Sequence, residues 1–487
     1  MESQEETITG VVEEITFQND QNGFTVLDFS AEDELFTAVG VMPGISAGET
    51  VSLTGNFVMH PTFGRQLKVT SFTRALPETS EQIVKYLSSG VIRGVGPKKA
   101  LLIVETFGAD TLNVIENEPE RLAQLKGISL EQAKNIGEEF KKQYAMRTVM
   151  LGLEKYGLSP NECVRIYKKL GIDAVEMVKE NPYCLCSLGI GVSFEKAVAI
   201  EEKLEQKPVP ECRIKEGILH VMRHNRNSRG HTCIPREKLL KPCADLLSTN
   251  EDTIDITIDS LVSVAQLKVH IIDGAEYIFL PTSYRDEKRI AERMGVVAKF
   301  PPPRMSTLAQ TIDDIEYEND IKYEELQRMA IATAANKGLL ILTGGPGTGK
   351  TTAIKGIIKV FEKQQLDIAL AAPTGRAAKR MTELTGREAK TIHRLLEVEW
   401  DEDDRPVFRR DTKNPLDCNA LILDELSMVD ISLFASLLDA LPLGCRLILV
   451  GDSDQLPPVG AGNVLHDLIK AEVLPVIELN KVFRQAM

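Results

Sequence analysis

Residues 343 to 352 combine glycines, a lysine and hydroxyl groups at a spacing suited to binding a triphosphate. The stretch reads TGGPGTGKTT and directly follows the apolar run 338–342. Glycines let backbone N–H groups approach phosphate oxygens, and a helix starting near Lys350 adds unpaired amides and the positive end of its dipole. We expect Lys350 to reach the β- and γ-phosphates and the Thr351 hydroxyl to bind Mg²⁺. The stretch therefore predicts a site for a nucleoside triphosphate with Mg²⁺; a glycine-rich turn that only joins a strand to a helix is the alternative.

One further side chain, Gln327, is a candidate for contacting the base of the nucleotide. It lies on an amphipathic helix expected over residues 323–338. A glutamine amide both donates and accepts hydrogen bonds, so Gln327 could read the adenine edge; a solvated helix glutamine is the alternative. The residues expected to surround the nucleotide are Gln327, Gly344, Gly345, Pro346, Gly347, Thr348, Gly349, Lys350, Thr351 and Thr352.

A parallel sheet is expected in the C-terminal part of the chain, because short apolar runs there alternate with helical patterns. The runs are LLILT, DIALAAPT, ALILDE and RLILVGDS. Ligands of such sheets gather at the carboxyl ends of the strands. The polar residues that end each run are therefore candidates for chemistry.

Two of these runs end in residues suited to hydrolysis. We expect Asp424 to hold Mg²⁺ through water and Glu425 to orient or deprotonate an attacking water. An acidic pair that caps a helix is the alternative. Gln455 can sense a γ-phosphate, and the rigid turn Pro457-Pro458 would pass its movement to a neighbouring surface. With Lys350, these three side chains are the candidate catalytic residues.

Another run leads into a helix start suited to a nucleic-acid backbone. Thr374, Gly375 and Arg376 stand at this start, where they could hold a backbone phosphate. His393 and Arg394, in the stretch TIHRLL, would lie on the same side.

The length and composition limit the classes of protein to which the chain can belong. At 487 residues the chain is long enough for about three to four domains. A net charge of −14 argues against a protein that coats nucleic acid diffusely but allows a local basic channel. Eight scattered cysteines without zinc spacing indicate reduced thiols. The N-terminus has no secretion pattern and no run reaches membrane-spanning length, which indicates a cytoplasmic protein.

Three regions are expected before the sheet. Residues 1–78 alternate apolar and polar positions in short bursts separated by turn signals, which predicts a five-stranded β-barrel of oligonucleotide-binding (OB) type. Residues 79–208 are helical and contain two hairpins that resemble helix-hairpin-helix units. Residues 209–300 predict a winged helix, with few basic residues on the helix that would enter DNA. Internal scaffolding is therefore favoured for that segment.

The first hairpin is the better candidate for holding DNA. Gly94, Gly96 and Lys98 would bind a phosphate through backbone amides and a positive charge, without reading its sequence. A purely architectural helical bundle is the alternative, because residues 81–150 carry almost no net charge.

Six motifs in chain order resemble those of superfamily 1 DNA helicases of the RecD-like type. They are GGPGTGKTT, APTGRAAKRM, TIHRLL, DELSMVD, GDSDQLPPVGAGNV and VFRQ, similar to motifs I, Ia, Ic, II, III and the start of IV. The barrel, the helix-hairpin-helix pair and the NPY at 181–183 resemble the N-terminal extension of the long RecD-like proteins that act outside the RecBCD complex. The match covers essentially the whole chain.

The resemblance implies a fold and a function. The fold is multidomain, α/β plus mostly α, with a P-loop RecA-like parallel α/β domain at 301–487. The implied activity uses ATP and Mg²⁺ for 5′-to-3′ translocation on single-stranded DNA and for unwinding the duplex ahead. The implied partners are single-stranded DNA and single/double-strand junctions, bound by a monomer that needs no membrane.

Two roles are assigned by the resemblance alone. Residues 395–412 are similar to the short β-hairpin of the family, called the pin, that parts the strands, with Trp400 at the shoulder of its turn. A surface hairpin without this duty is the alternative. Arg484 resembles the motif IV arginine that contacts the γ-phosphate.

The main departure from the family lies at Met487. In RecD-like helicases a second RecA-like domain with motifs V and VI follows motif IV, and we expect it to be absent here. Charges supplied across the cleft speed hydrolysis by about a thousand-fold or more. This chain alone is therefore expected to bind nucleotide and hydrolyse it poorly.

Two other functions remain as alternatives. The first is a DNA-binding module whose nucleotide site only regulates. The second is the motor part of a conjugative relaxase-helicase, although the N-terminal third has no cluster of histidines with a tyrosine that would form a nicking centre.

Overall fold

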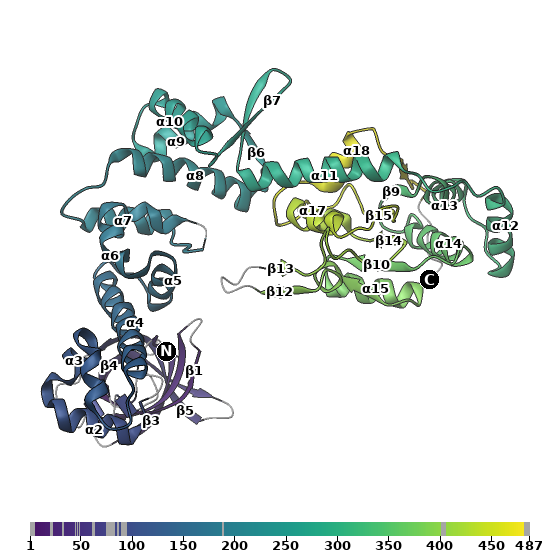
Figure 1. Cartoon of the computed structure of the whole chain (residues 1–487). Coiled ribbons are helices and arrows are strands. Elements are labelled where there is room, and N and C mark those ends of the chain that lie inside the picture. The colour runs from purple at the N-terminus through teal and green to yellow at the C-terminus, as the bar shows by residue number, and fades with distance from the viewer. Residues whose placement is uncertain are drawn as a thin grey trace. The chain divides into compact units, whose positions relative to one another are not determined.

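The computed structural model of the chain forms two compact units, Met1–Glu216 and Gly217–Met487. Their boundary falls inside the helix α8 (Pro210–Arg229), and Figure 1 shows the order of the elements. The structure describes residues 5–19, 23–31, 34–43, 45, 47, 49–60, 64–74, 83–84, 87–88, 95–187, 189–400 and 406–481.

Five strands at the N-terminus close into a barrel with the order β1-β2-β3-β5-β4. They are β1 (Glu6–Gln18), β2 (Phe24–Ala31), β3 (Glu34–Val41), β4 (Thr50–His60) and β5 (Gly64–Arg74). Alternate residues such as Leu27 and Phe29 point into the barrel and are fully buried, as the period of two in the sequence requires. The predicted small barrel is confirmed.

A helical region follows the barrel in the first unit. It contains α2 (Pro97–Phe107), α3 (Thr111–Asn117), α4 (Leu130–Glu154), α5 (Pro160–Leu170), α6 (Ala174–Glu180) and α7 (Phe194–Lys203). Ser129 begins α4 with a capping box: its hydroxyl accepts the Gln132 N–H, and the Gln132 side chain accepts the Ser129 N–H. Ile103, Ile115 and Ile136 pack in one buried cluster that joins α2, α3 and α4.

The second unit begins with a segment that has the element order of a winged helix. After α8 come β6 (Cys233–Pro235), α9 (Arg236–Leu247), α10 (Glu251–Ser263), β7 (Lys268–Ile272) and β8 (Ala275–Phe279). The strands form an antiparallel sheet in the order β6-β8-β7. We call residues 210–279 the winged-helix segment. The sequence did not indicate β6, because a strand of three residues forms only against its partner β8.

A parallel sheet with helices on both faces forms the rest of this unit, after the long helix α11 (Pro281–Lys299). Its strand order is β11-β10-β14-β15-β9-β16, and all neighbours pair parallel. The strands are β9 (Leu339–Thr343), β10 (Ile368–Ala372), β11 (Ala389–Thr391), β14 (Ala420–Leu423), β15 (Arg446–Val450) and β16 (Val476–Glu478). The helices are α12 (Leu308–Glu318), α13 (Glu325–Lys337), α14 (Lys350–Lys363), α15 (Gly375–Thr385), α16 (Ile392–Leu395), α17 (Ile431–Asp439) and α18 (Val464–Lys470).

The sheet is buried on both faces, which explains why its strands read as continuous apolar runs. Leu339 and Ile341 of β9 belong to one hydrophobic cluster, and Leu340 and Leu342 belong to the other. A short hairpin, β12 (Val398–Trp400) paired antiparallel with β13 (Pro406–Phe408), extends from the sheet domain. Residues 401–405, between the two strands, lie outside the described residues.

Among the residues placed by the structure, no helix is both long enough and apolar enough to cross a membrane.

Candidate nucleotide and nucleic-acid site

The loop between β9 and α14 can be formed only by glycine at several positions. Gly347 and Gly349 have φ angles of 77° and 89°, in the left-handed region that L side chains avoid. A Cβ added at Gly344 would lie 2.4 Å from the carbonyl oxygen of Leu479. The backbone therefore takes a shape in which its amides can line a concave surface.

Lys350 is folded back over this loop. Its ammonium donates hydrogen bonds to the carbonyl oxygens of Gly344 and Gly345, the second at 3.0 Å. The buried Thr348 hydroxyl also donates to the Gly345 carbonyl, at 2.9 Å. Thr351 follows in the first turn of α14 and is partly exposed. The lysine and the threonine predicted to bind phosphate and Mg²⁺ thus lie at the same end of one helix.

Gln327 makes its hydrogen bonds inside the protein. Its side-chain nitrogen donates to the Gly349 carbonyl at 3.3 Å, and its side-chain oxygen accepts the Glu324 N–H at 3.1 Å. The residue is 4% exposed. Gln327 therefore braces the loop from behind, and contact with an adenine edge stays a prediction.

The two predicted carboxylates directly follow β14. This strand pairs with β15, and β15 pairs with β9, the strand that leads into the loop. The Glu425 N–H donates to the Asp424 carboxylate at 2.9 Å, and the Asp424 N–H donates to the Ala371 carbonyl at 3.0 Å. Glu425 has a φ of 54°, in the left-handed region that is unfavourable for a glutamate, and such backbone strain is found mostly at functional sites. Burial raises the pKa of Asp424 above its usual value, and the charge of Glu425 adds to the rise while Lys350 opposes it.

Two buried hydroxyls join the motifs, and sequence reasoning missed both. The Thr343 hydroxyl, at the end of β9, accepts the Ser453 N–H at 3.3 Å and lies 3.3 Å from the Ser453 hydroxyl. The Ser427 hydroxyl, just after the carboxylates, donates to the side-chain oxygen of the exposed Gln455 at 3.1 Å. A hydroxyl at the last position of an otherwise apolar strand was the available signal for Thr343.

The predicted nucleic-acid residues of the second unit lie at two neighbouring helix starts. The Thr374 hydroxyl caps α15 by accepting the Ala377 N–H at 3.2 Å, and Arg376 is exposed beside it. A Cβ added at Gly375 would meet no atom within 4 Å, so the backbone there is open. Thr391 ends β11, pairs in register with Ala372 of β10, and caps α16.

His393 and Arg394 are exposed on α16, and their contact with a nucleic-acid strand stays a prediction. The His393 ring lies 5.9 Å from the ring of Phe408, at the base of the hairpin. Trp400 is 65% exposed on β12, where it pairs with Pro406 of β13. An aromatic side chain is thus presented to solvent at the end of a hairpin that starts beside the two helix starts.

Two of the described candidates for DNA contact belong to the first unit. Gly96 and the exposed Lys98 lie at the start of α2, in the first unit, where Pro97 is the first helical residue. Gly94 and Arg484 fall outside the described residues.

Four protein-family models match the chain. They are the ATP-dependent DNA helicase YrrC OB-fold domain (residues 5–77), the SAM-like helix-hairpin-helix tandem (85–142), the ATP-dependent RecD2 DNA helicase HHH domain (142–233) and an AAA domain (327–461). The third match runs past residue 208, the predicted end of the helical region, and our domain limits stay predictions.

A curated relative decides the family. The ATP-dependent RecD2 DNA helicase of Deinococcus radiodurans is 30% identical to this chain over an alignment that covers 98% of the chain and 68% of the relative. The chain belongs to the RecD2 family of ATP-dependent DNA helicases. RecD2 membership confirms the resemblance to RecD-like helicases and makes the protein an enzyme of the ATP-dependent helicase class.

Shorter matches extend to other helicases. The RecBCD enzyme subunit RecD of Mycobacterium tuberculosis is 42% identical to this chain over an alignment that covers 41% of the chain and 37% of the relative. The solved structure of Pif1 helicase from Candida albicans aligns over 34% of the chain and 41% of its own with 25% identity, at a TM-score of 0.24, which is too low to support a structural comparison.

Proposed function

We propose that this chain supplies the nucleotide-binding and DNA-contacting parts of a helicase that moves 5′ to 3′ on single-stranded DNA. One observation carries the proposal. In the strand order β11-β10-β14-β15-β9, the strands with the candidate nucleotide residues are neighbours, and the strands with the candidate DNA residues lie directly beside them. Because all these strands are parallel, both sets of residues lie along the same edge of one sheet.

The chemistry rests on four side chains. Lys350 would exchange its two carbonyl partners for phosphate oxygens, with the loop amides binding the same group. Glu425 would orient the attacking water and accept its proton. Gln455 has its side-chain oxygen held by Ser427, so its amide N–H groups remain free to donate to the γ-phosphate.

A magnesium ion fits the residues at this site. The Thr351 hydroxyl and the Asp424 carboxylate are hard oxygen donors of the kind that Mg²⁺ prefers. Burial raises the pKa of Asp424, and a cation beside the carboxylate would lower this pKa again by stabilising the ionised form. Mg²⁺ bound there would neutralise charge on the β- and γ-phosphates.

The DNA track is proposed along α15 and α16. At these two helix starts the backbone amides, with Arg376, His393 and Arg394, would bind successive phosphates of one strand. Trp400, on the adjoining hairpin, would stack on a base at the junction and keep the two strands apart. Gly96 and Lys98 would add a separate phosphate contact in the first unit.

The proposal is tested by ATP hydrolysis, with and without single-stranded DNA, in a form of the protein that also carries the second RecA-like domain. We expect the DNA to stimulate hydrolysis, and Lys350→Ala to lower the stimulated rate by about a hundred-fold or more. The control is Lys355→Ala, an exposed lysine on the same helix, which should leave the rate unchanged. Absence of DNA stimulation, with Lys350→Ala no slower than the parent, would refute the proposal.

A second assay separates helicase action from regulated binding. The substrate is a fork with a 5′ single-stranded tail, and strand separation is followed after adding ATP. Unwinding that requires ATP supports the helicase. ATP-dependent DNA affinity without unwinding would instead support the DNA-binding module with a regulatory nucleotide site.

A further inference from the structure

The helix α17 is the first long element after the two carboxylates. A single 3₁₀ turn, Leu426–Met428, separates Glu425 from Asp430, whose side chain caps α17 by accepting the Leu433 N–H at 2.9 Å. Motif III returns to the same place, because the Ile431 N–H donates to the Ala461 carbonyl at 3.0 Å. The N-terminal end of α17 is therefore where the segments that follow both motifs meet.

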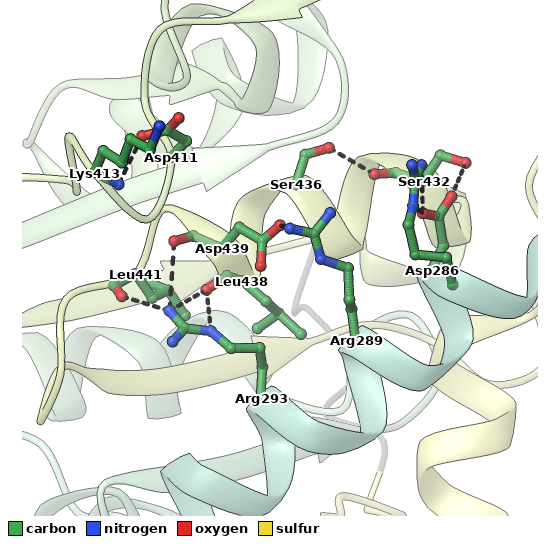
Figure 2. Close-up of polar contacts among 11 residues, drawn as sticks. Asp286, Arg289, Arg293, Asp411, Lys413, Ser432, Ser436, Leu438, Asp439 and Leu441 are labelled. Carbon is green, nitrogen blue, oxygen red and sulfur yellow. Dashed lines mark hydrogen bonds and ion pairs between the residues drawn. The ribbon is translucent and has the colours of Figure 1, made fainter. Parts of the chain in front are cut away.

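The C-terminal end of α17 is held by the helix α11, as Figure 2 shows. The Arg293 guanidinium donates to the carbonyl oxygens of Leu438, at 2.7 and 2.9 Å, and of Leu441, at 2.8 Å. Arg289 forms an ion pair with Asp439 at 2.9 Å. Helix ends leave carbonyls unpaired and carry partial negative charge, so two arginines suit this end. Met294 of α11 is buried and belongs to the hydrophobic cluster that also contains the buried residues of α17.

The N-terminal end of α17 is joined to two helices through one hydroxyl. The Ser432 hydroxyl donates to the Asp286 carboxylate of α11 at 2.8 Å and accepts from the Arg226 guanidinium of α8 at 3.2 Å. Asp286 is 5% exposed. Two hydrogen bonds on one neutral hydroxyl therefore connect the helix after motif II to α8, the first helix of the winged-helix segment, and to α11, the helix that follows the segment.

The end of motif III touches the winged-helix segment directly. The Gly462 N–H donates to the Gly230 carbonyl at 2.8 Å. A Cβ added at Gly460 would lie 2.2 Å from the Asp430 carboxylate, and one added at Gly462 would lie 2.2 Å from the Ile431 side chain. These glycines let the backbone of motif III pack between α17 and Gly230, the residue that follows α8.

We propose that Ser432, Asp286 and Arg226, together with the Gly230–Gly462 contact, transmit the nucleotide state of motifs II and III to the winged-helix segment. This inference rests on the proposed nucleotide site. The two arginines make the C-terminal end of α17 a fixed pivot, whereas the end nearest the carboxylates is joined by the Ser432 hydroxyl. A small movement of motif II or III displaces that end, and Ser432 carries the displacement to α8 and α11.

The test uses hydrogen–deuterium exchange of the whole chain with and without Mg²⁺ and a non-hydrolysable ATP analogue. We expect the analogue to slow exchange in the loop 344–352 and to change exchange in β6, β7 and β8. Ser432→Ala, which leaves the Gly230–Gly462 contact in place, should reduce the change in these three strands at least two-fold while the loop stays protected. Ser432→Thr, which keeps the hydroxyl, should restore it.

The matched control is Ser436→Ala, one turn further along α17. Its hydroxyl donates to the Ser432 carbonyl of its own helix, at 2.8 Å, so its removal should leave the change in the three strands intact. Arg226→Ala removes the other partner of the Ser432 hydroxyl and should give the same loss as Ser432→Ala, which provides a second variant should the first unfold.

The outcomes are distinguishable. Two outcomes overturn the coupling and leave the nucleotide site standing. In the first, the analogue protects the loop of the parent chain but does not change exchange in β6 to β8. In the second, the loop is protected and exchange in these strands changes equally in Ser432→Ala and the parent. No protection of the loop by the analogue overturns the nucleotide site and the coupling with it.

Discussion

At the scale of single residues, burial sets the chemistry of Asp424. Burial and the neighbouring charge of Glu425 raise the pKa of Asp424 above its ordinary value near 3.8. The folded protein therefore holds the proton more tightly than the unfolded chain does. The ionised carboxylate destabilises the fold, and this destabilisation develops as the pH rises from about 3.8 through the raised pKa.

Asp424→Asn should consequently raise the melting temperature at pH 7 in the absence of Mg²⁺ and nucleotide. The difference between the variant and the parent should shrink as the pH is lowered through the raised pKa of Asp424, because the parent carboxyl then takes up its proton. Melting curves across this pH range provide the measurement. Asp417→Asn, at an exposed position a few residues upstream, is the control and should not change the melting temperature. A variant less stable than the parent at pH 7 would show that burial does not dominate.

Residues in motifs of regular spacing could be predicted from the sequence. Residues whose role depends on a partner far away in the chain could not. Lys350, Asp424 and Gln455 could be chosen because each follows an apolar strand. Thr343 and Ser427 could not, since their partners Ser453 and Gln455 lie on another strand's loop.

At the scale of elements, α11 is the support of the helix that follows motif II. The Leu438 carbonyl near the end of α17 accepts the Leu441 N–H at 3.3 Å, and the Arg293 guanidinium adds donors to this carbonyl and to the Leu441 carbonyl. Charged hydrogen bonds of this kind contribute about 1.5–3 kcal/mol each.

Arg293→Ala should lower the free energy of unfolding of the second unit by about 2–4 kcal/mol. Urea unfolding, followed by a signal from this unit, measures the change. Lys288→Ala, on the exposed side of the same helix, should cost less than about 0.5 kcal/mol. Equal effects of the two substitutions would contradict the assigned role of Arg293.

Strands with their own periodicity could be predicted, and strands that depend on a neighbour could not. The barrel and the strands β9, β14 and β15 follow from alternation or from continuous apolar runs. β6 and β16 each have three residues and are defined by pairing with β8 and β9. Their short runs carry no periodic signal of their own.

At the scale of the whole molecule, the net charge of −14 requires that DNA be held at a few local points. The exposed Lys98, beside Gly96 at the start of α2, is one candidate in the first unit. A phosphate contact contributes equally to all sequences and depends on salt.

Lys98→Ala should therefore weaken binding to single-stranded DNA of any sequence. The slope of log affinity against log salt should fall in magnitude by about 0.7 for one lost phosphate contact. Fluorescence titrations at several salt concentrations measure both effects. Lys134→Ala, an exposed lysine on α4, is the control. An unchanged slope in Lys98→Ala would leave this helical region with an architectural role.

The short strand β16 has a consequence for the behaviour of the free sheet. It pairs with β9 on the side opposite β15, so the strand that leads into the phosphate loop has both of its edges occupied. Without Val476–Glu478, β9 would present a row of open N–H and C=O groups with apolar neighbours, a template on which a second copy could add its own strand. With β16 in place, the last strand in the described order of the sheet is only three residues long, which offers a second copy a much shorter edge than β9 would.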